Sequence, residues 1–465
     1  MITGWSFAAA DVAAWLCSFA IIFVVRTAIW GLSPLFWALW ATGVVWLIFR
    51  WASGLLPPTG LSQPEVLRRS VRTTAAAALL HIVLLAALGG WEGPRLISLG
   101  LWLFVIPSTY FFRAGVASLL YRRRSFGRPC IVIGSGEKAR SAIREMLGNW
   151  ELGLIPVAVF ADLPDQVERK FEGVPVLGPV ASVGSHNPAE KGAAAVIALS
   201  MREADRYSVE GGGWLASDLA RRYQIVRVLP DLASPTVLLV DARPIGVYLS
   251  LELRYARFST SQQIIKRLFD LAIAVPVFIL ALPFIAAGAI AVKIASPGPA
   301  FFSQKREGIG GDDVRIWKIR TMVPDAEKRL AEYLASNPAA RFEWERTLKL
   351  RNDPRIVPVV GSFLRRTSID ELPQLWNIIR GDMSLVGPRV MPVNEVDRYS
   401  QSGRELRRDV PPGLTGLWQI MHRNNSDLHI REVADSYYVN NWSIWMDSWI
   451  LLRTVRVVVG GSGAF

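Results

Sequence analysis

The stretch RRTSIDELPQLWN, at residues 365–377, places two adjacent carboxylates just before a predicted helix. Pro373 is tolerated best in the first turn of a helix, and Gly381 is a typical stop signal. The apolar residues between them have the spacing of one helix face: Leu372, Leu375, Trp376 and Ile379. The sequence therefore predicts a short helix with Asp370 and Glu371 at its start.

Asp370 and Glu371 have two interpretations. Ser368-x-x-Glu371 matches a capping box, and acids at a helix start are favoured by the helix dipole, so a purely structural role is one of them. The other is catalytic, because cations are dense nearby, in residues 304–306, 317–322, 351–355 and 387–389. Adjacent carboxylates among cations are typical of a site for a metal-bound diphosphate. One acid can hold Mg²⁺, and the other, ionised at neutral pH, can attack phosphorus.

The composition indicates a membrane protein. Of 465 residues, 51% are hydrophobic and only 20% are charged. The net charge of +13 favours anionic lipid or phosphate-rich ligands, whereas so apolar a chain argues against nucleic acid as a partner. The two cysteines exclude a disulfide framework, and the four scattered histidines give no zinc-ligand cluster.

Four apolar windows in residues 1–125 predict a transmembrane four-helix bundle. They cover residues 7–30, 32–49, 73–91 and 96–112, close to the ~17–25 residues that a bilayer requires. Lysine and arginine concentrate in the second connection and at the exit, which predicts that both ends of the bundle face the cytoplasm. Four buried helices of a soluble protein are the alternative, which the lack of a polar face disfavours.

Residues 126–260 predict a Rossmann-like module followed by a connector. An apolar strand leads into Gly134-x-Gly136-x-x-Ala139 and a helical pattern, and further strands are expected at residues 156–160, 194–199 and 225–229. Gly134 and Gly136 are candidate cofactor contacts, because such a turn presents backbone amides to phosphate. The acid expected about 20 residues on is missing, since Asp162 lies further away, so a module without a dinucleotide is the alternative. Residues 232–255 look strand-rich.

Residues 268–293 predict a re-entrant membrane helix. Their charge-free run contains Pro276 and Pro283, and a proline inside a helix removes a hydrogen bond and bends the axis. Both flanks are basic and a large polar domain follows. A fifth crossing would place that domain outside, against the positive-inside bias, so a helix that enters and returns is favoured over a straight span.

Ordered motifs between residues 260 and 465 resemble the bacterial sugar transferases, the monotopic polyprenyl-phosphate phosphoglycosyl transferases. They are KRLFD at 266–270, WKIRTM at 317–322, DPR at 353–355, SIDELPQ at 368–374, DMSLVGPR at 382–389 and PGLTGLWQ at 412–419. The bundle and the Rossmann-like module resemble the long, galactose phosphotransferase type. Two departures stand out. Leu282-Pro283 replaces the family's Ser-Pro, and Val390 replaces the second proline of Pro-Arg-Pro.

The resemblance implies a mainly helical catalytic domain at residues 261–465, on the cytoplasmic face of the bacterial inner membrane. It implies a catalytic dyad at Asp370 and Glu371, Mg²⁺ with Glu371 as its ligand, and a covalent phosphosugar on the aspartate. The substrate contacts that we predict are Lys305, Arg306, Lys318, Arg320, Arg355, Arg365, Arg389 and Asp435.

The expected reaction moves a hexose-1-phosphate, of galactose or glucose, from a UDP-sugar to undecaprenyl phosphate. It releases UMP and starts a surface polysaccharide. The expected partners are these two substrates and membrane lipid, and a second copy of the chain is a further candidate. A membrane-bound nucleotide-sugar dehydratase or epimerase would need a Tyr-x-x-x-Lys pair, which the chain lacks. A non-catalytic nucleotide-sensing scaffold would not need Asp370, and a conventional glycosyltransferase would release UDP.

Overall fold

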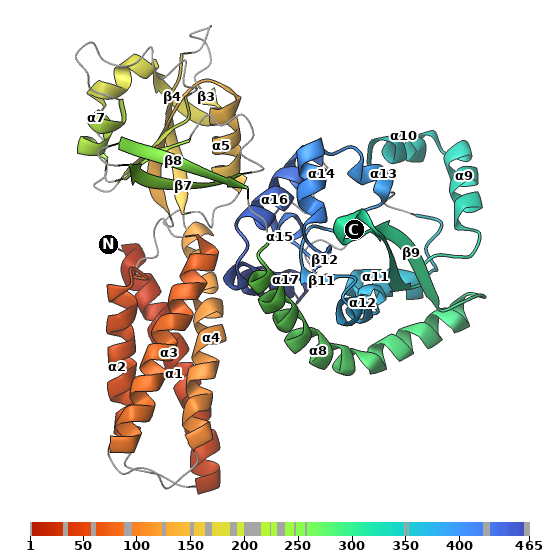
Figure 1. Cartoon of the computed structure of the whole chain (residues 1–465), viewed down its shortest axis with the longest axis horizontal. Coiled ribbons are helices and arrows are strands. Elements are labelled where there is room, and N and C mark those ends of the chain that lie inside the picture. Colours follow the sequence, from red (N-terminus) through yellow and green to blue (C-terminus); the bar gives the residue numbers. More distant parts are fainter. Residues whose placement is uncertain are drawn as a thin grey trace. The chain divides into compact units, whose positions relative to one another are not determined.

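The computed structural model describes most of the chain (Figure 1). The described residues are 2–30, 36–56, 62–87, 95–122, 127–148, 153–162, 170–186, 193–199, 215–223, 225–229, 238–245, 248–255, 258–347, 350, 353–421 and 428–459. They form two compact units, Met1–Ala233 and Ser234–Phe465. The connector that we grouped with the Rossmann-like module thus falls, from Ser234 onward, in the second unit.

The first unit begins with the predicted four helices, which are α1 (Ile2–Trp30), α2 (Phe36–Ala52), α3 (Gln63–Ala87) and α4 (Arg95–Arg122). Helices α1, α3 and α4 are long and apolar enough to cross a membrane. Helix α2 has 17 residues, at the lower limit for a span. The chain is therefore a membrane protein.

One buried polar cluster links all four helices of the bundle. Asp11 of α1 accepts from Arg50 of α2 at 2.7 Å and from Arg113 of α4 at 2.6 Å. Arg50 also donates to the hydroxyl of Ser70 in α3 at 2.8 Å. Asp11 and Arg50 are completely buried. Because a charge buried in an apolar bundle is costly unless it is paired, this carboxylate joins helices that are far apart in sequence.

The first unit also contains the predicted parallel α/β module. Its sheet has the order β3-β4-β2-β1-β5-β6. The strands are β1 (Arg128–Ile133), β2 (Leu154–Phe160), β3 (Lys170–Phe171), β4 (Val174–Gly178), β5 (Ala194–Ile197) and β6 (Ile225–Val228). All pairs are parallel except β3 with β4. The helical elements are α5 (Glu137–Gly148), η2 (Val180–Ser185) and α7 (Leu215–Arg222).

Gly134 has a structural reason to be glycine. Its φ is +142°, and a Cβ there would lie 2.6 Å from the carbonyl oxygen of Ala198. The turn after β1 thus passes against the backbone that follows β5, while Gly136 has open space around it. Cofactor binding by these two glycines stays a prediction.

The second unit starts with an antiparallel hairpin, β7 (Leu238–Ile245) and β8 (Tyr248–Tyr255), which confirms the strand-rich segment. The rest is mainly helical, as predicted. In chain order it contains α8 (Thr260–Ala295), β9 (Phe301–Glu307), η3 (Ile309–Gly311), β10 (Asp313–Ile319), α9 (Ala326–Ser336), α10 (Pro338–Thr347), α11 (Val360–Thr367), η4 (Ile369–Glu371), α12 (Gln374–Arg380), β11 (Ser384–Val386), α13 (Val393–Val396), α14 (Gln401–Arg408), β12 (Gly413–Thr415), α15 (Leu417–Met421), α16 (Leu428–Asn440) and α17 (Ile444–Val459).

Helix α8 is one continuous element of 36 residues that contains Pro276 and Pro283. It is long and apolar enough to cross a membrane. In Figure 1 it follows a curved path along one side of the second unit, from α17 toward β9. Prolines inside a helix are the usual cause of such a bend.

The N-terminal part of α8 is bonded to three other elements of the second unit. Lys266 pairs with Asp447 of α17 at 2.7 Å. Arg267 donates to the carbonyl oxygens of Ile378 and Ile379 at 2.5 and 2.6 Å, which caps the C-terminal end of α12. Asp270 accepts from the Ser384 hydroxyl of β11 at 2.7 Å.

The other end of α8 is fastened as well. Arg320, just after β10, donates to the carbonyl oxygens of Pro297 and Ser296 at 2.6 and 2.9 Å. In between, Gly288 lets the helix approach the domain, since a Cβ there would lie 3.0 Å from Ile319 and 3.2 Å from Leu364. Both ends of α8 are therefore bonded to one and the same domain.

The bundle cluster can be tested by removing its carboxylate. We expect Asp11→Ala to destabilise the protein by about 3–5 kcal/mol, because it leaves two guanidiniums buried without their counter-charge. Glu65→Ala is the control, since Glu65 pairs with Arg68 and Arg69 in a partly exposed position, where a pair contributes about 0–1 kcal/mol. Unfolding curves of the detergent-solubilised protein measure both. Equal, small losses for the two variants would show that the cluster does not hold the bundle.

Candidate active site

The predicted carboxylate pair lies in η4, between α11 and α12. Pro373 is the N-cap of α12, and Gly381 ends that helix with a φ of +99°, so both predicted helix signals are confirmed. The capping-box interpretation is wrong. Ser368 has a φ of +57°, and its side chain caps neither helix, because the left-handed backbone that ends α11 turns it away from the amides of η4.

Glu371 faces a cation from the neighbouring hairpin. Its Oε1 atom lies 2.7 Å from Nζ of Lys318 in β10, and about one third of each side chain is exposed. The pair therefore remains accessible to a ligand.

Asp370 is the deeper of the two acids, with 9% of its surface exposed. Burial and the neighbouring charge of Glu371 raise the pKa of the Asp370 carboxyl to about 6, against the opposing effects of Lys318 and Arg365. Within the described part of the chain, no other side chain donates a hydrogen bond to it. The carboxylate is therefore mostly ionised at pH 7 and is not occupied by another side chain.

Asn377 sets the distance between the dyad and Lys318. It is fully buried in α12. Its Oδ1 atom accepts from the Trp317 amide at 3.1 Å, and its Nδ2 atom donates to the Arg315 carbonyl at 2.7 Å. These bonds tie α12 to β10 close in sequence to Lys318 and Glu371, which face each other. Sequence reasoning missed this role, although an amide within an otherwise apolar helix face was a signal.

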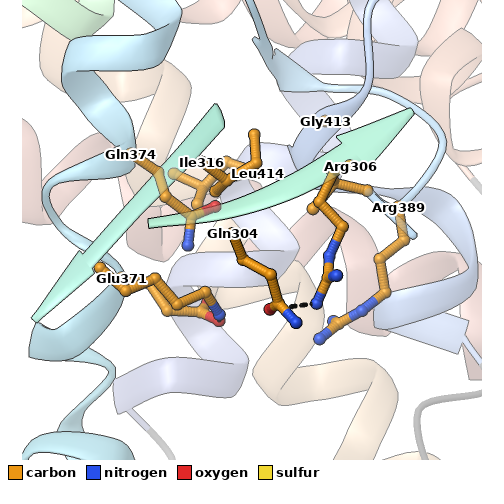
Figure 2. A pocket seen from close by; sticks show the side chains of 10 residues that line it. Gln304, Arg306, Ile316, Glu371, Gln374, Arg389, Gly413 and Leu414 are labelled. Atoms are coloured by element: carbon orange, nitrogen blue, oxygen red, sulfur yellow. Dashed lines mark hydrogen bonds and ion pairs between the residues drawn. The ribbon is translucent and has the colours of Figure 1, made fainter. Parts of the chain in front are cut away.

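A pocket opens beside the dyad (Figure 2). Glu371 lies at one side of it, and the guanidiniums of Arg306 and Arg389 lie together at the other. Arg306 donates to Oε1 of Gln304. The pocket is lined by Gln304, Arg306, Ile316, Lys318, Glu371, Gln374, Arg389, Val390, Gly413 and Leu414.

Arg306 and Arg389 give the pocket a positively charged side. Neither guanidinium makes an ion pair with a carboxylate among the residues that the structure describes. The pKa of Arg306 is lowered mainly by burial; the charge of Glu395 opposes this shift, and the smaller effect of Arg389 adds to it. Two neighbouring guanidiniums without an ion-pair partner among the described residues favour a multiply charged anion such as a diphosphate.

Gln374 is a pocket residue that sequence reasoning did not single out. Only 2% of it is exposed, yet its side chain makes no hydrogen bond to any described residue. It lines the pocket, and Figure 2 shows it on the same side as Glu371. A buried amide without a protein partner favours a polar ligand in this space.

The remaining predicted contacts lie outside the pocket lining. Arg365 donates to the Thr321 hydroxyl at 2.9 Å and acts electrostatically on Asp370. The exposed Lys305 pairs with Asp313 at 3.1 Å. Arg320 caps α8 as described above.

Arg355 and Asp435 are held by other residues. Arg355 lies 2.6 Å from Asp353 and stacks on the Trp344 ring. Asp435 is buried against Arg407. Arg351, in one of the cation-rich segments, lies outside the described residues.

The predicted Mg²⁺ would need oxygen ligands, and Asp370 and Glu371 offer two carboxylates. Across the described ranges there is no group of three or more His, Cys, Asp or Glu side chains that could hold a metal. Mg²⁺ is commonly bound by one or two carboxylates together with substrate phosphates and water. Asp370 and Glu371 therefore fit an ion shared with a diphosphate.

Adjacent acids beside a cationic pocket in a membrane protein have the features expected of an enzyme that transfers phosphate groups. The model of the bacterial sugar transferase family matches residues 261–461, and that of a CoA-binding domain matches residues 60–207.

Similar proteins agree with these matches. The chain is 34% identical to a UDP-galactose-lipid carrier transferase of Erwinia amylovora, over 82% of this chain and 78% of that protein. It is 32% identical to an undecaprenyl-phosphate galactose phosphotransferase of Salmonella typhimurium, over 86% and 82%. The exopolysaccharide production protein ExoY of Sinorhizobium fredii is 42% identical over 43% of this chain and 88% of its own length. The chain belongs to the bacterial sugar transferase family and is a phosphoglycosyl transferase.

The burial of Asp370 predicts a pH-dependent cost to stability. We expect Asp370→Asn to stabilise the protein at pH 8 by up to about 3 kcal/mol, because a folded-state pKa near 6 means that the ionised carboxyl opposes folding. The gain should shrink as the pH falls from 6 to 4, where the native carboxyl takes up its proton before the unfolded one does. Unfolding measured at pH 8 and pH 4.5 tests this.

The matched control has the opposite sign. The pKa of Asp353 is lowered, because its burial is outweighed by hydrogen bonds from Arg355 and nearby positive charge. Asp353→Asn should therefore destabilise the protein at pH 8, where the carboxylate is charged in both states. A stabilising Asp353→Asn, or a destabilising Asp370→Asn, would contradict the electrostatic assignment.

Proposed function

We propose that this enzyme transfers a hexose-1-phosphate from a UDP-sugar to undecaprenyl phosphate, releasing UMP and starting a surface polysaccharide. The observation that carries the proposal is the buried Asp370, to which no described side chain donates a hydrogen bond, beside the Glu371–Lys318 pair. Next to it is a pocket with two guanidiniums that form no ion pair with a described carboxylate. The relatives support the substrate classes, because their names carry UDP-galactose, lipid carrier and undecaprenyl phosphate.

Asp370 is the proposed nucleophile. An oxygen of its carboxylate attacks the β-phosphorus of the UDP-sugar, and the bond between that phosphorus and the bridging oxygen breaks as UMP leaves. A phosphate oxygen of the lipid then attacks the same phosphorus, which transfers the sugar phosphate and restores the carboxylate. No general base is needed, because both nucleophiles are already anions.

Charge neutralisation is the main catalytic requirement, since an anion must approach an anion. Arg306 and Arg389 would hold the diphosphate at one side of the pocket, and Lys318 would face it at the other. Glu371 would help to hold Mg²⁺ with the phosphates. When bound, that ion would offset the charge that develops on the leaving UMP.

Galactose is the proposed sugar, because two relatives that align over more than four fifths of this chain carry galactose in their names. Glucose is the alternative. A UDP-glucose:undecaprenyl-phosphate glucose-1-phosphate transferase of Escherichia coli is 37% identical over 42% of this chain.

We propose further that α8 is re-entrant in a bacterial inner membrane, with the catalytic domain cytoplasmic. The support is that Lys266, Arg267 and Asp270 at one end, and Ser296 at the other, are bonded to elements of one domain. A straight crossing would separate these contacts by a bilayer about 30 Å thick.

The topology can be tested with single cysteines at Ser261 and Ser336, in a variant whose Cys17 and Cys130 are replaced. Both serines are exposed, and they flank α8 in sequence. In intact cells an impermeant maleimide should label neither, while permeabilisation should expose both. A cysteine between α3 and α4, which the loop charges predict to lie outside, is the positive control. Labelling at Ser336 alone would establish a crossing.

The mechanism predicts that UMP forms before the lipid acceptor is present. We expect about one UMP per enzyme from UDP-galactose alone, and its rate should fall below pH 6 as Asp370 becomes protonated. Asp370→Asn should lower the rate at least about 10³-fold. Glu371→Gln should mainly weaken the metal dependence. Rates come from rapid-quench assays at pH 5 to 8.

The control for this experiment is Glu332→Gln, whose partner is the exposed Lys328; it should react as the wild type does. Release of UDP would indicate a conventional glycosyltransferase. A fully active Asp370→Asn would rule out Asp370 as the nucleophile, whereas a wild-type protein that releases no nucleotide would support the non-catalytic scaffold.

A further inference from the structure

The pocket residue Arg389 lies in a turn that this chain holds without the family's second proline. Val390 follows Arg389 where that proline is expected. On one side, the Gly413 amide donates to the Pro388 carbonyl oxygen at 2.8 Å, next to β12. A Cβ on Gly413 would overlap the backbone of Gly387, so the two segments are in direct contact.

On its other side the turn is held by Arg407 of α14. Nη2 of Arg407 donates to the backbone carbonyl oxygen of Arg389 at 2.8 Å. A hydrogen bond from a charged guanidinium is stronger than one between neutral groups, and here it acts on the residue whose side chain lines the pocket.

Arg407 is itself fixed by a buried network. Its Nη1 atom donates to the Asp435 carboxylate of α16, and about 5% of each side chain is exposed. The Tyr399 hydroxyl donates to the same carboxylate at 3.2 Å, and the guanidinium of Arg407 lies 5.2 Å from the Tyr399 ring centroid. Side chains from three separate segments thus form one network, and within it Arg407 bonds to the backbone carbonyl of Arg389.

We propose that Arg407 and Asp435 are positioning residues, which fix the backbone of Arg389 so that its guanidinium meets the diphosphate of the UDP-sugar. This inference rests on the proposed function, in which Arg389 binds that diphosphate. It also reassigns Asp435 from the predicted substrate contacts, because the carboxylate acts two hydrogen bonds away from the pocket. A charged side chain binds its ligand less tightly when the backbone that carries it can move.

A double-mutant cycle tests the inference. Arg407→Gln should raise the KM for the UDP-sugar about tenfold and change kcat much less, since the dyad keeps its own contacts. Arg389→Gln should raise the KM at least as much. In the combined variant Arg407→Gln should add less than about twofold, because it acts only through Arg389. Arg404→Gln is the matched control on α14, with an exposed pair to Asp397 at 3.5 Å, and its KM should not change.

Two variants keep the test informative if Arg407→Gln does not fold. Arg407→Lys retains the charge and should recover part of the KM, and Tyr399→Phe removes only the hydroxyl and should raise KM by about two- to threefold. Both effects should vanish in an Arg389→Gln background. Additive effects on KM would overturn the inference while leaving the anion site intact. An unchanged KM in Arg389→Gln alone would instead refute the proposed diphosphate contact, and the inference with it.

Discussion

Two neighbouring carboxylates, one of them buried, are the constraint on which this catalytic domain depends. Asp370 and Glu371 repel each other, and burial adds to the cost, so cations must stand close by. Lys318 reaches Glu371 because Asn377 bonds β10 to α12, and Arg365 approaches Asp370 from α11. The dyad is thus supported by separate elements, each fixed by buried bonds. The ionised Asp370 lowers the free energy of unfolding, and in the proposed mechanism the same carboxylate is the nucleophile.

Helix α8 is likewise held by buried or partly buried polar bonds to the rest of its domain. The charged side chains near the start of α8 bond to α17, α12 and β11. At the other end of the helix, Arg320 donates to the carbonyl oxygen of Ser296. Because Arg267 caps the C-terminal end of α12, the helix that follows the dyad is tied directly to α8. Insertion of α8 into a bilayer surface would therefore set the position of the catalytic residues relative to a lipid phosphate. The buried carboxylate of Asp11 has the corresponding role in the separate four-helix bundle.

Local patterns carried the predictions that were confirmed. The helix after Pro373, its stop at Gly381 and the parallel strands of the α/β module each depend on residues close in sequence. Contacts between distant segments could not be read in this way. Arg320 lies in a cation-rich segment and is therefore predicted to contact the substrate, yet its partners are the carbonyl oxygens of residues 296 and 297. Asp435 finds Arg407, and Asn377 finds β10, only after folding. Ser368 does not cap the helix, because its backbone is left-handed. A non-glycine residue rarely adopts that conformation, so nothing in the sequence indicated it.

The central claim is that the sugar phosphate becomes attached to the deeper acid of the pair. Mass spectrometry of the wild-type enzyme, quenched after incubation with UDP-galactose and no lipid, tests it most directly. Cleavage after Arg366 and Arg380 isolates residues 367–380, which contain both acids. The account predicts a hexose-phosphate adduct on this peptide, with fragment ions that place it on Asp370. An adduct on Glu371, or a peptide that stays unmodified while product forms, would contradict it.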